Sequence, residues 1–195
     1  MQIKTKIVIK KVAFLGDAEA KRYQLHWRSA YKIAKLLAEN GFSIVNGGGP
    51  GVMLASTLGA KAAGGRVELV VIPKENQPDS FEGSHKRNIA LADKIYYENN
   101  YHERLAKIVS ISDAFVIFKG GTGTISEVGL TWELAKFDYK KGIVEPLVFY
   151  GTAWENIIKQ MRKSLPLTKD ETEVYTIARQ PKDVLNYLVK ASAEN

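Results

Sequence analysis

The stretch KGGTGTISE, residues 119–127, has the residue types of a phosphate-binding turn. Glycines let a backbone approach a phosphate closely, and threonines add hydroxyl donors. A helix that begins here would also direct its free N–H groups and positive dipole end at an anion. A tight turn without a ligand is the alternative for one such motif alone. The sequence predicts a phosphate cradle formed by Gly120, Gly121, Thr122, Gly123 and Thr124.

A second glycine-rich turn, GGGPG at residues 47–51, also follows an apolar segment and precedes a helical pattern. Two such turns at one edge of a sheet favour a ligand there, and we expect Gly48, Gly49 and Met53 to line its site. The first strand-to-helix turn, FLGDAEA, lacks the G-x-G-x-x-G pattern of dinucleotide-binding proteins, and KGGTGT lacks the G-x-x-x-x-G-K-[ST] pattern of P-loop nucleotidases. Neither a standard dinucleotide-binding site nor a Walker-type nucleotidase is therefore expected.

Strand-like and helix-like segments alternate along the chain. Both glycine-rich turns follow a strand and precede a helix, so both are expected at the same edge of one sheet. Continuous apolar strands with intervening helices indicate a parallel sheet covered on both faces. We predict a Rossmann-like α/β fold and a single nucleotide-binding domain over residues 1–195. Strands are expected at 6–15, 42–45, 67–72, 95–97, 114–118 and 147–150. Helices are expected at 21–40, 52–63, 101–110, 124–137, 154–163 and 181–190, with a loop at 74–84 and an irregular segment at 165–176.

Composition excludes several classes of function. The chain has no cysteine, and its three histidines lack metal-ligand spacing, so we expect neither disulfides nor a metal site. No apolar run is long enough to span a membrane, and the N-terminus resembles a first strand more than a signal peptide, so a cytoplasmic protein is expected. The net charge of +7 comes from scattered lysines. This favours a solvated surface over a nucleic-acid-binding one.

Three segments together resemble the LONELY GUY (LOG) family, also labelled lysine decarboxylase-like. They are GGGPGVM at 47–53, YHERLAKIVSISDAFVIFKGG at 101–121 and GGTGTISE at 120–127. The family signature is approximately P-G-G-x-G-T-x-x-E, with an upstream H-x-R-K segment, and the resemblance covers roughly residues 12–160. Lys119 replaces the family proline, and Leu105 replaces the lysine after the arginine.

The resemblance implies a Rossmann-like homodimer without a cofactor. It also implies hydrolysis of the N-glycosidic bond of nucleoside 5′-monophosphates, cytokinin ribotides or AMP-like, releasing free base and ribose 5-phosphate. Arg104 and Glu127 match the family's catalytic pair. The expected partner is thus a nucleoside monophosphate, with no nucleic acid and no membrane.

The chemistry of these two side chains agrees with the implied roles. A carboxylate near the anomeric carbon can stabilise an oxocarbenium-like transition state and orient water. An arginine can bind phosphate or stabilise charge on the leaving base. Both residues also have structural interpretations: Thr124 and Glu127 match a T-x-x-E capping box, and Arg104 could form a surface ion pair with Glu103.

Two other classes of function stay open. The same cradle could serve a non-catalytic nucleotide carrier or a carrier similar to molybdenum-cofactor carrier proteins. It could also serve a nucleotide-sensing module of a larger assembly, although no appended domain or linker supports that. A pyridoxal-phosphate decarboxylase is excluded because neither Lys107 nor Lys119, near the glycine edge, is marked as a buried Schiff-base lysine.

Overall fold

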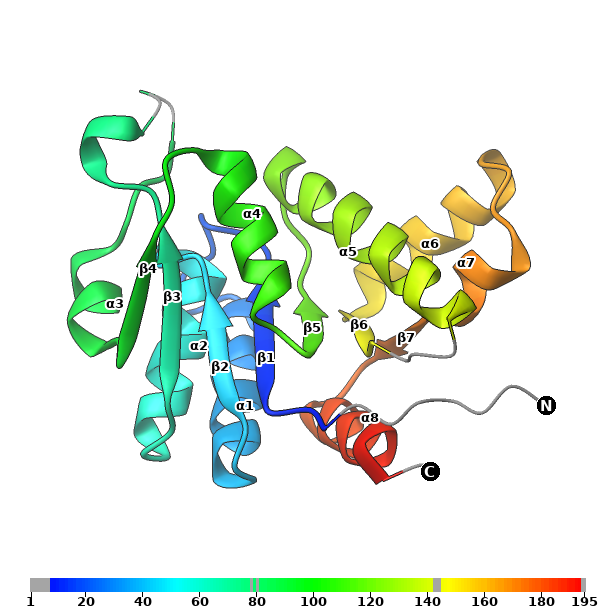
Figure 1. Ribbon diagram of the computed structural model, residues 1–195. Helices are drawn as coiled ribbons and strands as arrows, with labels where there is room; N and C mark the ends of the chain where they lie inside the picture. Colours follow the sequence, from blue (N-terminus) through cyan, green and yellow to red (C-terminus); the bar gives the residue numbers. More distant parts are fainter. Residues whose placement is uncertain (1–7, 78, 80, 142–144, 194–195) are drawn as a thin grey trace.

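The computed structural model describes residues 8–77, 79, 81–141 and 145–193. These residues form one parallel sheet with the strand order β4-β3-β2-β1-β5-β6-β7 (Figure 1). The predicted α/β fold class is therefore confirmed. The strands are β1 (Lys11–Leu15), β2 (Ser43–Asn46), β3 (Val67–Val71), β4 (Lys94–Tyr97), β5 (Ala114–Ile117), β6 (Leu147–Tyr150) and β7 (Tyr175–Ala178).

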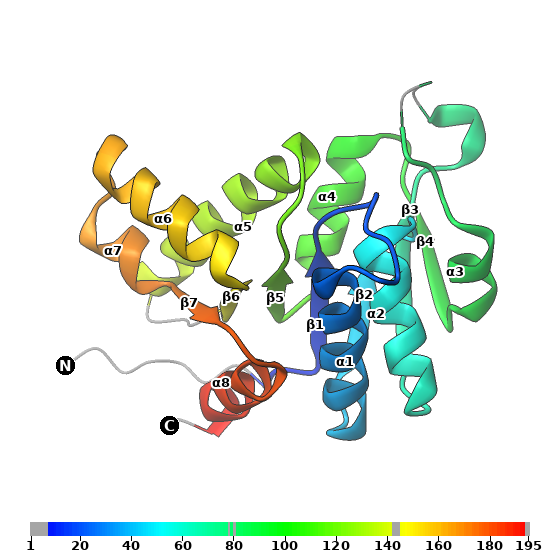
Figure 2. The same cartoon turned by 180° about the vertical axis from the view of Figure 1, so that it is seen from behind.

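Helices cover both faces of the sheet. One face, seen in front in Figure 2, packs against α1 (Leu25–Glu39), α2 (Gly51–Ala62), α3 (Lys86–Leu91) and α8 (Pro181–Ala193). The other face packs against α4 (Tyr101–Ser110), α5 (Thr122–Lys140) and α6 (Thr152–Ser164), while the short helix α7 (Lys169–Glu173) packs against α5. A short 3-10 turn, Lys74–Asn76, follows β3.

The core consists of two apolar layers that share the sheet. Side chains of a strand alternate between its faces, so Val12 and Phe14 contact the α1 layer, while Ala13 and Leu15 contact the α5 layer. All four are at most 2% exposed. This double coverage explains why the strands are continuous apolar runs in the sequence.

The strand order reverses between β1 and β5, which are neighbours in the sheet. The segments that follow these two strands therefore meet at the carboxyl edge, where the amide of Asp17 donates to the carbonyl of Lys119 at 3.2 Å. In open parallel sheets, ligands bind in the crevice at such a reversal.

The structure corrects the predicted local structure at three places. The segment 165–176, expected to be irregular, contains α7 and the start of the edge strand β7. The α7 helix is short but has a capping box, in which Thr168 and Glu171 satisfy each other's backbone amides. The helix expected to begin at residue 21 begins at Leu25, and α3 was not expected. Residues 6 and 7 of the first predicted strand, and 78 and 80 of the predicted loop, lie outside the described residues.

Close contact between α1 and α2 depends on Gly59, and Gly129 on α5 provides a matched control. A methyl group at Gly59 would lie 2.1 Å from the carbonyl oxygen of Tyr31, whereas at Gly129 it would meet no atom within 4 Å. We expect Gly59→Ala to lower the free energy of unfolding by roughly 1–3 kcal/mol in urea denaturation. Gly129→Ala should raise it by about 0.5–1 kcal/mol, because alanine favours helix. Equal effects of the two substitutions would contradict this packing.

Candidate active site

A pocket of about 320 Å³ lies at the strand-order reversal between β1 and β5. Most of the residues selected from the sequence line it together: Met53, Arg104, Gly121, Thr122, Gly123, Thr124 and Glu127. Gly48, Gly49 and Gly120 are not among the lining residues. The structure thus gathers residues from α2, α4 and α5 at one site.

The first turn of α5 forms one wall of this pocket. The helix begins at Thr122, after Gly121 as N-cap, and the amide of Ile125 makes the first helical bond to the carbonyl of Gly121 at 3.1 Å. The preceding amides of Thr122, Gly123 and Thr124 have no acceptor within the helix. These N–H groups and the positive dipole end are suited to an anion such as a phosphate.

The early start of α5 removes the capping-box interpretation of Glu127. Thr124, predicted as the helix start, is the third residue of the helix and not its N-cap. Its side chain is buried, and its Oγ1 would lie 2.1 Å from a methyl group at Gly120. Gly120 therefore permits close packing beneath the turn, and Glu127 is not committed to a cap.

Arg104 is a buried cation held mainly by backbone carbonyls. Its side chain is 3% exposed; Nε donates to the carbonyl of Val70 at 3.1 Å, and Nη2 donates to that of Gly47 at 3.0 Å. The suggested surface pair with Glu103 is not formed, because that carboxylate accepts bonds from Asn99 and Asn100. A charged group buried at a pocket is a sign of function more than of stability.

The segment before α3 contributes a carboxylate and an aromatic ring on the pocket side of Arg104. Glu82 Oε1 lies 4.0 Å from Arg104 Nη2, and the Phe81 ring centroid lies 5.3 Å from the guanidinium carbon. Glu82 also lines the pocket. The guanidinium is therefore placed between structural carbonyls and the space where a ligand would bind.

Glu127 has one face toward the pocket, while protein atoms surround the rest of its side chain. Burial raises the pKa of Glu127 to about 8; nearby Arg104 lowers that pKa, and Glu82 raises it further. Beside it, the Tyr101 hydroxyl donates to the carbonyl of Gly123 at 3.1 Å, and burial raises the pKa of this tyrosine as well. In the free pocket, burial therefore favours the neutral form of Glu127.

Four polar side chains that line this pocket were not expected from the sequence: Asp17, Glu19, Glu82 and Tyr101. Asp17 follows β1 at the strand-order reversal, so its position could have been found from the expected topology. Its carboxylate is held by His26 Nε2 at 3.1 Å and by the amide of Glu19 at 2.8 Å. Tyr101 begins the H-x-R helix segment, whereas no pattern marks Glu82.

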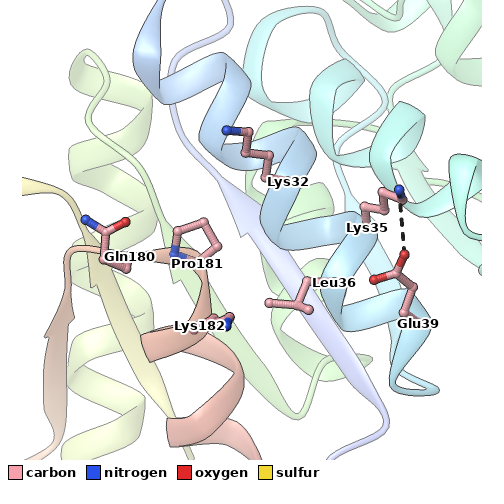
Figure 3. A pocket seen from close by; sticks show the side chains of 7 residues that line it. All are labelled: Lys32, Lys35, Leu36, Glu39, Gln180, Pro181 and Lys182. Atoms are coloured by element: carbon pink, nitrogen blue, oxygen red, sulfur yellow. Dashed lines mark ion pairs between the residues drawn. The ribbon is translucent and has the colours of Figure 1, made fainter.

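A larger hollow of about 480 Å³ lies between α1 and the start of α8 (Figure 3). It contains lysines, an apolar floor and an ion pair at 3.7 Å between Lys35 and Glu39. Its charged groups do not converge on one point in this view, and none was selected from the sequence. The smaller pocket at β1 and β5 is therefore the candidate active site.

The described residues contain neither a metal-binding cluster nor a membrane-spanning helix. Within those residues, no group of three or more histidine, aspartate or glutamate side chains could hold a metal ion. No helix in the described part of the chain has the length and apolar character needed to cross a bilayer.

Comparison with known proteins identifies the family. The model of the SLOG cluster4 family matches residues 9–165. A rice (Oryza sativa subsp. japonica) protein named "Probable cytokinin riboside 5'-monophosphate phosphoribohydrolase LOGL2" is 24% identical over 93% of this chain and 72% of its own. An uncharacterised Archaeoglobus fulgidus protein is 36% identical over 62% of this chain and 71% of its own.

Solved structures agree on the fold. The molybdenum cofactor binding protein of Rippkaea orientalis matches 93% of this chain and 95% of its own, with a TM-score of 0.67 and 18% identity. At this identity, the likeness concerns the fold alone. The chain belongs to the SLOG cluster4 family, and the resemblance to LOG proteins noted in its sequence is confirmed.

Arg104 and Glu82 have opposite effects on the pKa of Glu127, so the geometry of the site can be tested without a substrate. Carboxyl ¹³C NMR should show Glu127 of the free protein titrating near pH 8. Glu82→Gln removes a like charge and should lower the midpoint, whereas Arg104→Gln removes the opposite charge and should raise it. Circular dichroism controls for folding. Shifts in the same direction in both variants would contradict the assigned geometry.

Proposed function

We propose that this protein hydrolyses the N-glycosidic bond of nucleoside 5′-monophosphates and releases a free base and ribose 5-phosphate. One observation carries the proposal: Arg104 and Glu127 line the same pocket as the first turn of α5. A cation, a carboxyl group and an anion-binding helix end are thus available to a single ligand. The pocket volume of about 320 Å³ is in the range of small-molecule sites.

In this proposal the 5′-phosphate binds the amides of Thr122, Gly123 and Thr124 at the start of α5. This places the ribose near Glu127, one helical turn further along. A water oxygen bonds to C1′ as the C1′–N bond breaks, and the bonding electron pair leaves with the base. Glu127 in its carboxylate form orients the water, stabilises positive charge on the ribose and takes the water proton. The base leaves with a proton from solvent, and Arg104 stabilises negative charge as it develops on the base.

The names of the LOG relatives support this reading, since they specify a phosphoribohydrolase of cytokinin riboside 5′-monophosphates. The fold-level similarity to a molybdenum cofactor binding protein keeps a carrier as the second candidate. The environment of Glu127 favours the enzyme, because strongly shifted pKa values beside a charged partner in a pocket are typical of catalytic groups.

The proposal includes the other expectations from the sequence. The reaction requires no cofactor or metal, the ligand is a nucleotide and not a nucleic acid or a membrane, and the protein acts in the cytoplasm. We also propose a homodimer. The exposed α5 side chains Ile125 and Phe137, 53% and 45% accessible, are candidates for contacts between copies.

A product assay tests the reaction directly. We expect free base from AMP or isopentenyladenosine monophosphate, detected by chromatography, and none from the corresponding nucleosides, because these lack the phosphate that α5 binds. Glu127→Gln should lower kcat by about 100-fold or more while nucleotide binding persists in calorimetry. Glu133→Gln, on the same helix but outside the pocket lining, should be nearly silent. If the wild type bound nucleotides tightly but released no base, the hydrolase would be ruled out and the carrier function would be favoured.

The pH dependence of kcat/KM tests the form in which Glu127 acts. The folded-state pKa of this carboxyl is raised to about 8, so the carboxylate fraction grows about tenfold per pH unit below that value. We expect kcat/KM to rise up to about pH 8 and then level off. Glu82→Gln should move this limb to lower pH. A rate that falls above pH 8 would instead show that the protonated form acts, as a general acid.

A further inference from the structure

The glycine turn 47–49 has all three of its carbonyls bound by different parts of the fold. The first carbonyl accepts from Arg104 Nη2 at 3.0 Å, the second from the amide of His85 at 2.9 Å, and the third from Asn88 Nδ2 at 2.9 Å. This turn does not line the pocket. The turn 47–49 is therefore a fixed frame for the site, and the guanidinium of Arg104 is hydrogen-bonded to its first residue.

A buried amide network sets the position of this frame. Ser56 donates its hydroxyl proton to the carbonyl of Met53 at 2.8 Å, so it can only accept from Asn46 Nδ2, at 3.2 Å. Asn46 Nδ2 also donates to Thr57 Oγ1 at 2.9 Å. The amide orientation of Asn46 is thereby fixed, and its Oδ1 accepts the amide of Gly48 at 2.9 Å.

Asn88 on α3 is fully buried, and its two contacts determine its orientation. Its Nδ2 lies 2.9 Å from the carbonyl oxygen of Gly49 and 3.3 Å from Asn46 Oδ1. Both partners are acceptors, so the NH₂ group must face them. Asn88 Oδ1 has no hydrogen-bond partner in the structure. An unpaired buried acceptor is costly, so the contribution of this amide here lies in its two donated bonds.

We propose that Asn88 is a positioning residue that holds the turn 47–49 in place and, through the carbonyl of Gly47, fixes the guanidinium of Arg104 at the pocket. The path consists of hydrogen bonds joined by the backbone of the turn: Asn88 donates to Gly49 and Asn46, Asn46 accepts from Gly48, and Gly47 accepts from Arg104. The catalytic consequence rests on the proposed function. The link between Asn88 and the position of Arg104 does not rest on the proposed function, because it concerns only the placement of the guanidinium.

Asn88→Leu tests the link without adding charge. Leucine has a similar size but donates no hydrogen bonds, so the carbonyl of Gly49 would lose a buried donor and the turn would shift. A displaced Arg104 would lower the pKa of Glu127 less than it does now. Glu82, the other charged group that acts on Glu127, would continue to raise this pKa. By carboxyl ¹³C NMR, the Glu127 midpoint should rise by roughly 0.5 pH units or more.

A double-mutant cycle separates positioning through Arg104 from general loosening of the fold. Once Arg104→Gln has removed the guanidinium, adding Asn88→Leu should move the Glu127 midpoint no further. Asn186→Leu, at an exposed position on α8, is the matched control and should leave the midpoint unchanged. Additive shifts in the double variant, or an unchanged midpoint in folded Asn88→Leu, would overturn the proposal.

Asn88→Ser provides the same readout should the leucine variant not fold, because serine is small and keeps one donor. Activity then adds a separate line of evidence. With the hydrolase established, kcat should fall by roughly 10- to 100-fold with little change in KM, since a displaced catalytic group costs turnover. A wild-type protein that releases no base would sink the proposed function, while the shift of the Glu127 midpoint would still decide the role of Asn88.

Discussion

The buried guanidinium of Arg104 is the group on which the candidate site depends. A cation with 3% of its side chain exposed must regain in protein contacts the hydration that it loses. Two carbonyls supply these contacts, from Val70 on β3 and from Gly47 after β2. Gly47 can do so only without a side chain, because a methyl group there would lie 1.8 Å from Arg104 Nη2. The glycine at position 47 therefore allows both the close packing at the sheet edge and the placement of the guanidinium.

Burial and the neighbouring guanidinium act in opposite ways on the pKa of Glu127. Burial disfavours the charged form of Glu127 and raises its pKa, while the guanidinium of Arg104 partly restores that form. Glu82 opposes this restoration, since its carboxylate lies 4.0 Å from Arg104 and adds negative charge near Glu127. The ionisation of Glu127 is thus set by three elements that are distant in sequence: α4, α5 and the segment before α3. A change in any of them is transmitted to the carboxyl group.

Apolar patterning and glycine placement predicted the sheet, most of the helices and the edge where the site lies. What the sequence could not give depends on tertiary contacts. The strand β7 is half-buried at the edge of the sheet, so its apolar pattern is weak. Residues Glu82 and Asn88 act at the site only because the segment around α3 folds over the turn 47–49. The capping interpretation of Glu127 followed from spacing alone, and a helix start only two residues earlier removed it.

The two departures from the LOG signature are explained by where their side chains lie. Leu105 is buried and Lys119 is exposed, and neither lines the pocket. The side chains that do line it include four carboxyl groups, those of Asp17, Glu19, Glu82 and Glu127, and a single arginine. An anion at this site would therefore depend on the backbone amides and dipole of α5 more than on cationic side chains. Such a cradle is independent of the residues at positions 105 and 119. The carboxyl groups at the pocket would also repel any phosphate charge that the helix end does not neutralise.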